Sequence, residues 1–367
     1  MQLPTKFELL VVGAGPAGAR AAAIAAAQGS ETVLIDSKVR IGEQPHCGEF
    51  VPRQVFTELG LDRSSVIQSV EFMESTILDS KLTEQAVSGT HSTQPSPGFV
   101  IDRVRFDRDL AREAASKGAL VQAAARLVGY DSGSWIIRHG STEQTVRPEL
   151  VIAADGALST VASCLGMERP NVLRGLQVEA PLKRPLDRTF IFLNQAIVGG
   201  YGWLFPKGNV ANVGVGAIPG DRTSPATLLD ELVKMLCESE MIGPGILARS
   251  GGLIPVSGMR DTLINGNVLF CGDAAGLTHP ITGAGIPQAL ISGRDAASAA
   301  VTALKQGSRQ ALMDYEKETR GRYKGVIHHA LSKREVMMRH WNDKDFEKTC
   351  KQTWIAFKEY RKRVRRT

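Results

Sequence analysis

The sequence of 367 residues predicts an α/β protein in three parts: a Rossmann-like dinucleotide-binding domain, a mostly antiparallel β-sheet domain and a C-terminal helical segment. Three observations predict this fold class. The first 36 residues alternate as buried strand, glycine-rich turn, alanine-rich helix and second strand. Residues 171–254 contain short alternating runs that are typical of antiparallel strands. Residues beyond 305 are charged and have helical spacing.

Composition indicates an ordinary globular protein, with 43% hydrophobic and 22% charged residues. The sequence has no apolar run of the roughly 18 to 20 residues that a membrane span needs, and its N-terminus lacks the order of a signal peptide. We therefore expect a cytoplasmic protein. Its five cysteines are odd in number and far apart, so the sequence predicts no metal site and no disulfide framework.

The expected elements follow one another in a pattern that divides the chain. The dinucleotide-binding domain is expected from residues 1–65, 98–170 and 255–305, the sheet domain from 66–97 and 171–254, and the helical region from 306–367. Within the first domain we expect strands at 7–12, 32–36 and 150–156, and helices at 19–29, 52–59, 102–119 and 283–305. Within the second we expect strands at 173–180, 188–194, 200–206 and 210–217, and a helix at 225–240. The polar stretch 88–98 is expected to be a surface loop.

A G-x-G-x-x-G motif, formed by Gly13, Gly15 and Gly18 with Ala17 between, connects the first strand to the first helix. Backbone amides at such a turn can hold a pyrophosphate at the helix N-terminus. Asp36 ends the next strand, where a carboxylate can accept hydrogen bonds from ribose hydroxyls. A glycine-rich packing turn is the alternative, but strand, helix and acidic residue together favour dinucleotide binding.

Two further segments resemble the signatures of the p-hydroxybenzoate hydroxylase-like flavoproteins: "VIAADGALSTV" (151–161) and "NVLFCGDAAGLTHPITGAGI" (267–286). The segment "DRVRFDRDL" (102–110), which lies between the glycine-rich turn and the first of these segments, resembles the arm of the same flavoproteins. This resemblance implies FAD as the cofactor and a p-hydroxybenzoate hydroxylase-like FAD-binding domain. It also implies the contact residues Arg103, Asp155, Gly156, Gly272 and Asp273, although Asp273 could be only a helix cap. Gly283 and Gly285 follow Pro280 where a helix begins, so the backbone there can approach a flat ring closely.

The chain contains a single G-x-G-x-x-G motif, so a separate nicotinamide domain is not evident. We therefore expect FAD to be reduced either by transiently docked NAD(P)H or by a partner electron donor.

Three aromatic residues, Tyr201, Trp203 and Phe205, alternate along one predicted strand. Residues two apart share a face of a strand, so these side chains can form a wall for an apolar or aromatic substrate beside the flavin. Packing of a sheet face in the core is the alternative.

The stretch "YGWLFPKGNVANVGVG" resembles the Tyr-x-Trp-x-Phe-Pro motif of the geranylgeranyl reductase family, and "PHCGEFVPR" resembles its Pro-x-x-Cys-Gly-Glu loop. This resemblance implies reduction of isolated double bonds in prenyl chains, with hydride from reduced FAD. Cys47 is the best candidate near the ring, as a proton donor, a flavin contact or only a small buried thiol, and His46 and Glu49 are the other catalytic candidates. Flavin halogenases have a related motif, but Tyr201 and Phe205 depart from it.

Two other functions stay open at this point. One is an FAD-dependent monooxygenase that hydroxylates an aromatic group, including a side chain of a partner protein. The other is a flavin electron carrier or sensor that turns over no small substrate. Because one fold can serve several chemistries, the fold does not decide between them.

The basic charge of the protein belongs to its C-terminal tail. Residues 344–367 contain nine Lys or Arg and three Asp or Glu, which accounts for the whole net charge of +6. Apolar residues at positions 346, 350, 354, 357, 360 and 364 have the spacing of one helix face. This pattern predicts a basic amphipathic helix that either contacts an anionic membrane surface or an acidic protein, or packs on the body. The neutral body makes nucleic acid a poor partner.

Overall fold

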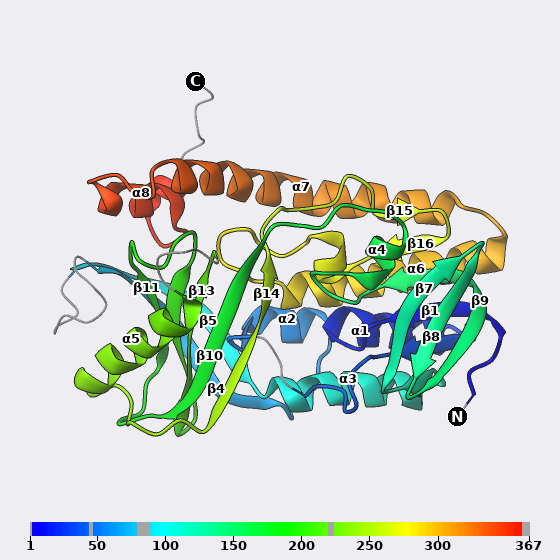
Figure 1. Cartoon of the computed structure of the whole chain (residues 1–367), viewed down its shortest axis with the longest axis horizontal. Coiled ribbons are helices and arrows are strands. Elements are labelled where there is room, and N and C mark those ends of the chain that lie inside the picture. Colours follow the sequence, from blue (N-terminus) through cyan, green and yellow to red (C-terminus); the bar gives the residue numbers. More distant parts are fainter. Residues whose placement is uncertain (1, 44–46, 79–88, 219–223, 362–367) are drawn as a thin grey trace.

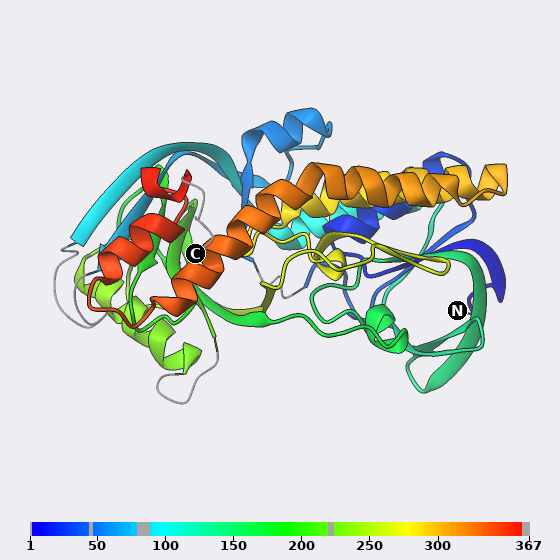
Figure 2. The same ribbon diagram turned by 90° about the horizontal axis from the view of Figure 1, so that it is seen from above.

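A computed structural model of the protein describes residues 2–43, 47–78, 89–218 and 224–361. Two sheet-containing parts lie side by side, and the long helix α7 (Gln310–Arg339) runs across both of them (Figure 1). The view from above shows the same helix leading from the first part to the C-terminal helix beside the second (Figure 2).

The first sheet is the predicted dinucleotide-binding sheet, with strand order β15-β16-β9-β1-β2-β6. Its four inner pairings are parallel, whereas β15 pairs with β16 and β7 pairs with β8, and β8 with β9, in antiparallel fashion. Parallel strands are covered on both faces, which explains why β1 is apolar over nearly its whole length. The strands are β1 (Lys6–Val12), β2 (Thr32–Ile35), β6 (Leu120–Gln122), β7 (Ala125–Asp131), β8 (Ser134–His139), β9 (Thr142–Ala153), β15 (Ile264–Asn265) and β16 (Val268–Phe270).

Helix α1 (Pro16–Ala27) packs between two helices of this part, α3 (Arg103–Ser116) and α6 (Ile286–Gln306). Its alanine side chains are short, so the helices can approach closely, and Pro16 suits the first turn because that position needs no N–H. Three short helices complete this part: α2 (Arg53–Glu58), α4 (Thr160–Cys164) and the 3₁₀ turn η1 (Gly272–Ala275).

The second sheet has the order β14-β10-β13-β12-β11-β4-β5-β3 and is antiparallel except where β11 pairs with β4. The structure therefore confirms a mostly antiparallel sheet. Its strands are β3 (Phe50–Pro52), β4 (Val66–Leu78), β5 (Gly89–Ile101), β10 (Val172–Pro181), β11 (Arg188–Leu193), β12 (Tyr201–Lys207), β13 (Val210–Ala217) and β14 (Ala248–Pro255). The sequence pattern did not predict the edge strand β14, because Gly251 and Gly252 interrupt the alternation of apolar and polar residues.

The two faces of this sheet have different partners. Helix α5 (Pro225–Glu238) covers one face, where Leu204 and Val213 belong to a buried apolar cluster. Trp203 and Tyr201 alternate with those residues and point to the opposite face, where they pack with residues of the C-terminal segment. The predicted alternation of β12 is therefore present in the structure.

Residues 89–98 of the polar stretch are not the surface loop that composition predicted, and Ser88 lies outside the described residues. From Gly89 the stretch forms the first part of β5, which pairs with β4 over thirteen residues. A bulge between Val70 and Phe72 absorbs the extra residues near Pro95, in agreement with the confinement of proline to bulges and edges. Long-range pairing, which composition cannot reveal, overrides the local turn signal.

The predicted amphipathic helix of the tail is also wrong in extent. Helix α8 (Phe346–Thr353) ends at Trp354, whose backbone is extended, and a 3₁₀ turn η2 (Lys358–Arg361) follows. The side chains of Phe346, Cys350, Trp354 and Phe357 are all buried against the second sheet and α7. No helix in the described ranges is both long enough and apolar enough to cross a membrane.

Candidate active site

Two glycines of the G-x-G-x-x-G turn leave no room for a side chain. A Cβ at Gly13, where φ is +98°, would lie 2.5 Å from the Ala154 carbonyl oxygen, and one at Gly18 would lie 1.8 Å from the Gly13 carbonyl oxygen. A Cβ at Gly15 would meet no described heavy atom within 4 Å, so the N-terminus of α1 faces open space. Free amides at that N-terminus can bind a pyrophosphate.

Asp36 is fixed just beyond the carboxyl end of β2. Its carboxylate accepts hydrogen bonds from the amides of Ala14 (2.7 Å) and Lys38 (2.8 Å). Each oxygen keeps a second lone pair that can accept from a ribose hydroxyl. A shallow groove of about 540 Å³ lies close to Asp36. Its wall includes Val121 and Ala123, and the carbonyl of Gln122 between them accepts a hydrogen bond from the Asp36 amide. Three arginines that our sequence analysis missed also line the groove: Arg40, Arg108 and Arg112.

Three turns that are distant in the sequence meet here. A Cβ on Gly13 would lie 2.9 Å from the Asp155 Cα, and one on Gly272 would lie 3.0 Å from the Ala17 Cβ. Asp155 Oδ2 accepts from the Val161 amide, whereas its buried Oδ1 has no partner within the described part of the chain. Gly156 continues that turn with φ at +85°. An orphaned buried acceptor and an open helix N-terminus fit a dinucleotide that brings hydroxyl donors and an anionic linker.

The loop before α6 is held tightly by its own backbone. The His279 amide donates to Ala284, Gly283 has φ at +68°, and Gly285 caps α6. The His279 Nδ1 accepts hydrogen bonds from the Ile281 and Thr282 amides, and burial lowers the pKa of His279 to about 4. A neutral imidazole therefore organises the loop at neutral pH. Asp273 accepts from the Thr278 hydroxyl beside this loop, and burial raises the pKa of its carboxyl.

The positive charge of Arg103 acts to lower the pKa of both Cys47 and Asp273. Its guanidinium forms two hydrogen bonds with Asp107, at 3.0 and 2.9 Å, and both side chains are nearly buried. Burial alone acts to lower the pKa of Arg103, but the charge of Asp107 and the neighbouring Cys47 raise it overall. Arg103 is therefore a fixed cation beside Asp107 and Cys47.

Cys47 and Glu49 are the two catalytic candidates that lie within the described residues. Burial raises the pKa of the Cys47 thiol, and the positive charge of Arg103 offsets this only in part. The thiol therefore keeps its proton at neutral pH, and its sulfur accepts a hydrogen bond from the Glu49 amide at 3.2 Å. His46 lies outside the described residues.

Glu49 is held by protein groups on both carboxylate oxygens. Oε1 accepts from the Arg103 amide at 3.0 Å, and Oε2 accepts from the Asn212 side chain and from Lys207 at 2.8 Å. Its backbone has φ at +70°, a conformation that costs a non-glycine residue about 1 to 3 kcal/mol. These contacts make Glu49 an anchor that ties the Cys47 loop to the hairpin of β12 and β13.

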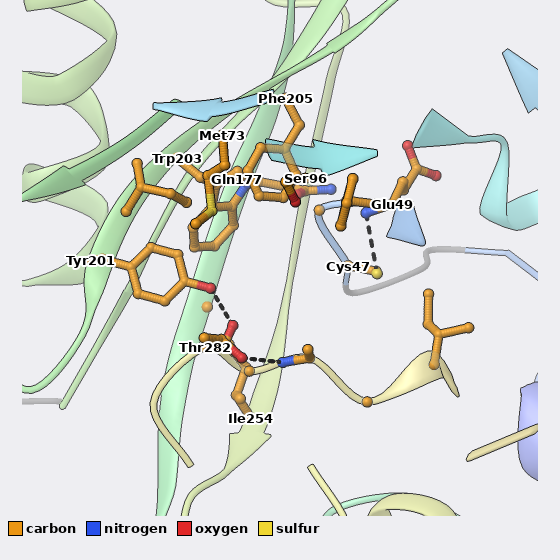
Figure 3. Close-up of a pocket in the computed structure, with 18 of the residues that line it drawn as sticks. Cys47, Glu49, Met73, Ser96, Gln177, Tyr201, Trp203, Phe205, Ile254 and Thr282 are labelled. Carbon is orange, nitrogen blue, oxygen red and sulfur yellow. Dashed lines mark hydrogen bonds between the residues drawn. The ribbon is translucent and has the colours of Figure 1, made fainter. Parts of the chain in front are cut away.

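A cavity of about 360 Å³ lies between the second sheet and the turns described above (Figure 3). Its walls include Cys47, Gly283 and Gly285 from the first part and the predicted aromatic residues Tyr201, Trp203 and Phe205. The Tyr201 hydroxyl donates to the Thr282 carbonyl, which joins the aromatic strand to the loop before α6. The structure therefore brings the predicted substrate wall and part of the predicted cofactor set to one cavity.

One row of directly paired residues on neighbouring strands of the second sheet, called the register row below, crosses the floor of this cavity. Trp203 lies opposite Gly214 on one side and Ile191 on the other. A Cβ on Gly214 would lie 2.2 Å from Trp203 Cζ2, so the indole ring rests directly on this glycine. The same row continues from Gly214 to Gln177, and from Gln177 to Ser250 on the edge strand.

Two buried polar atoms in this row lack a hydrogen-bond partner among the described residues: Trp203 Nε1 and Gln177 Oε1. Both residues line the cavity and are more than nine-tenths buried. An unpaired buried polar group costs about 1 to 3 kcal/mol. A ligand with an oxygen atom would recover part of this cost.

Sequence reasoning missed several residues of the cavity and its supports. Lys207 and Asn212 lie within the quoted aromatic segment, and their alternation with the apolar positions was a usable signal. Gln177 and Trp354 come from distant segments, so no local pattern indicated them.

Comparisons with known proteins agree with this geometry. Residues 6–193 match the model of the FAD binding domain, and residues 180–251 match the geranylgeranyl reductase catalytic domain. The digeranylgeranylglycerophospholipid reductase of Methanosphaerula palustris is 32% identical over 335 residues, which cover 87% of this chain and 82% of that protein. This protein belongs to the geranylgeranyl reductase family. As a member, it is an FAD-dependent oxidoreductase, and FAD is the cofactor that the three turns fit.

Solved structures give the same result. A geranylgeranyl bacteriochlorophyll reductase-like protein from Thermoplasma acidophilum superposes with a TM-score of 0.82 at 27% identity, covering 96% of this chain and 92% of that chain. A flavin-dependent brominase superposes with a TM-score of 0.74 at 15% identity, covering 93% and 92% of the two chains. The second similarity concerns the fold alone.

Proposed function

We propose that this protein reduces carbon–carbon double bonds in the isoprenoid chain of a lipid. The observation that carries the proposal is the apolar cavity that joins the aromatic strand β12 to the loop before α6. The relatives named above as digeranylgeranylglycerophospholipid reductases suggest the class of chain. An alkene has no charge to be recognised, so binding must rest on shape and apolar contact.

Reduced FAD supplies hydride when it is bound. The residues of the chain hold the alkene against the cavity floor and exclude water. Rigid placement matters because a misplacement of about 1 Å can cost about a hundredfold in rate. Trp203 is fixed on Gly214, and Tyr201 is fixed by the Thr282 carbonyl.

We propose that Cys47 protonates the alkene carbon that does not receive the hydride. Its thiol lines the cavity and keeps its proton at neutral pH, because burial raises its pKa. Glu49 is assigned a positioning role instead, since both of its oxygens already accept from protein donors.

The electron donor remains part of the proposal, and NAD(P)H or a partner protein is expected to supply the electrons. Anaerobic titration of the FAD-loaded protein with NADH and with NADPH distinguishes direct reduction from dependence on a partner. Bleaching of the flavin by NADH or NADPH at a rate that supports turnover favours direct reduction by the nucleotide. Bleaching by dithionite but by neither nucleotide favours a partner protein as the donor.

The basic tail is proposed to contact an anionic lipid surface through charge only. Its apolar residues Phe346, Cys350, Trp354 and Phe357 are buried in the fold, so they are not free to insert into a bilayer. Deleting residues 362–367 and measuring binding to vesicles that contain anionic lipid tests this contact. Unchanged binding would exclude it.

Anaerobic mixing of the reduced protein with an isoprenoid lipid tests the reaction itself. We expect the flavin to be oxidised in step with saturation of the chain. Flavin oxidation only after oxygen is admitted, together with hydroxylation of an aromatic compound, would instead identify a monooxygenase. Cys47→Ala should slow the anaerobic step while leaving flavin binding intact, and Cys164→Ala is a matched control.

A further inference from the structure

The C-terminal segment, residues 346–361, contributes two residues to the wall of the cavity. The tail pattern left open whether this segment contacts a membrane surface, contacts a partner or packs on the body; in the structure Trp354 and Ile355 line the cavity. Both lie outside the two segments that match the family models, residues 6–193 and 180–251. We propose that this segment closes one end of the cavity and that Trp354 limits the length of isoprenoid chain that the protein accepts. The inference rests on the proposed function for the nature of the substrate.

Trp354 is fixed by specific contacts with the sheet. Its indole Nε1 donates to Ser75 Oγ at 2.9 Å, and its ring lies 4.8 Å from the ring of Tyr201. Ser75 pairs with Ile191, so it belongs to the same register row as Trp203 and Gln177. Trp354 therefore stands over the β4 end of the row that forms the cavity floor.

The segment around Trp354 is fastened from two sides. On the side of α7, the buried Lys333 donates to the carbonyls of Gln352 (2.9 Å) and Glu359 (3.3 Å). On the side of β5, the Ser92 hydroxyl donates to the Ala356 carbonyl at 2.9 Å. These bonds bracket Trp354 along the chain, so the indole is a fixed wall of the cavity.

The opposite end of the row is different. It reaches the edge strand β14 at Ser250, Gly251 and Gly252, which are small and only half-buried. Trp354 is 3% exposed. An apolar chain that enters past the small residues of β14 would run along the row and stop at the indole.

The size of the cavity agrees with a stop at this point. An apolar cavity of about 150 Å³ holds benzene, which corresponds to about 25 Å³ for each carbon. The cavity of about 360 Å³ would then hold about fourteen carbons, fewer than a chain of four isoprene units. Removing the indole is expected to lengthen the cavity toward α8.

Binding of saturated isoprenoid alcohols to the FAD-loaded protein tests the proposal without requiring turnover. Dissociation constants are measured by calorimetry for alcohols of ten, fifteen and twenty carbons. We expect Trp354→Ala to improve the ratio of affinities for the twenty- and ten-carbon alcohols by about tenfold or more, because relief of a steric limit in an apolar pocket has effects of this size. Trp354→Phe should give an intermediate ratio.

Trp341→Ala is the matched control. Trp341 is 2% exposed, belongs to the same buried cluster and donates its indole N–H to the Gln195 carbonyl, but it does not line the cavity. It should lose comparable thermal stability and keep the wild-type ratio. The same ratio in wild type and both Trp354 variants, an equal change in Trp341→Ala, or no binding of any alcohol would overturn the proposal. A changed ratio without any alkene reduction would refute only the proposed function.

Discussion

Replacing Gly214 by alanine tests whether the aromatic wall depends on a missing side chain. The new Cβ would lie 2.2 Å from Trp203 Cζ2 and 2.7 Å from the Leu176 carbonyl oxygen, whereas ordinary contacts begin at 3.4 Å. The indole must therefore move by about 1.2 Å, and the backbone of β10 by about 0.7 Å. Overpacking of this kind costs about 1 to 3 kcal/mol of stability. The displaced wall should also lower kcat/KM for alkene reduction by about a hundredfold.

Gly216→Ala is the matched control, because Gly216 lies on the same strand and the same face. Its Cβ would meet Ile254 and Trp203 at 3.6 Å, which is ordinary contact. Alanine generally suits a strand interior better than glycine by about 0.5 to 1 kcal/mol, so this variant should be neutral or slightly more stable. Thermal unfolding of the FAD-loaded proteins and kcat/KM are measured for both variants. Equal behaviour of the two would refute the packing of Trp203 on Gly214.

Three further predictions concern the supports of the site. Burial lowers the pKa of His279 to about 4, so the unfolded chain binds a proton before the folded protein does as pH falls, and about 3 kcal/mol of stability present above pH 6.5 should be lost between pH 6.5 and 4. The stability of His279→Asn, whose side-chain oxygen replaces Nδ1, should depend less on pH. Parallel curves of stability against pH for the two proteins would contradict this. Lys207→Met breaks the ion pair with Glu49, so it should cost about 3 kcal/mol of folding stability and speed labelling of Cys47 by a thiol reagent. Glu179→Gln, which removes the more exposed partner of Lys207, should do neither. An unaltered labelling rate would show that Glu49 does not anchor the Cys47 loop. Gln177→Leu should raise stability by about 1 kcal/mol because it removes an unpaired acceptor, yet lower kcat/KM for isoprenoids that carry a hydroxyl donor. A loss of stability would show that the amide is paired in the fold.

Local sequence signals predicted the conformation of the glycine turns that fit the cofactor. Gly13 and Gly18 are required by contacts with backbone atoms, and such requirements leave the same residues at the same spacing wherever the turn occurs. The alternation of Tyr201, Trp203 and Phe205 was equally readable, because a strand places every second side chain on one face.

Long-range pairing explains what the sequence pattern could not supply. The stretch from residue 89 to 98 looks like a loop but is held as a strand by β4. The tail has helical spacing through Trp354, yet its backbone becomes extended there because Ser75 and Tyr201 hold the indole. Periodicity reports which residues are buried, and it does not report which distant surface buries them.

The central claim is that bound FAD faces the cavity between Cys47 and the aromatic strand. The structure of the FAD-loaded protein with a saturated isoprenoid alcohol tests it most directly. We predict a flavin ring bordering the cavity at Gly283, with the alcohol lying along the row that contains Trp203. A flavin ring remote from Tyr201 and Trp203, or an alcohol bound elsewhere on the protein, would contradict the account.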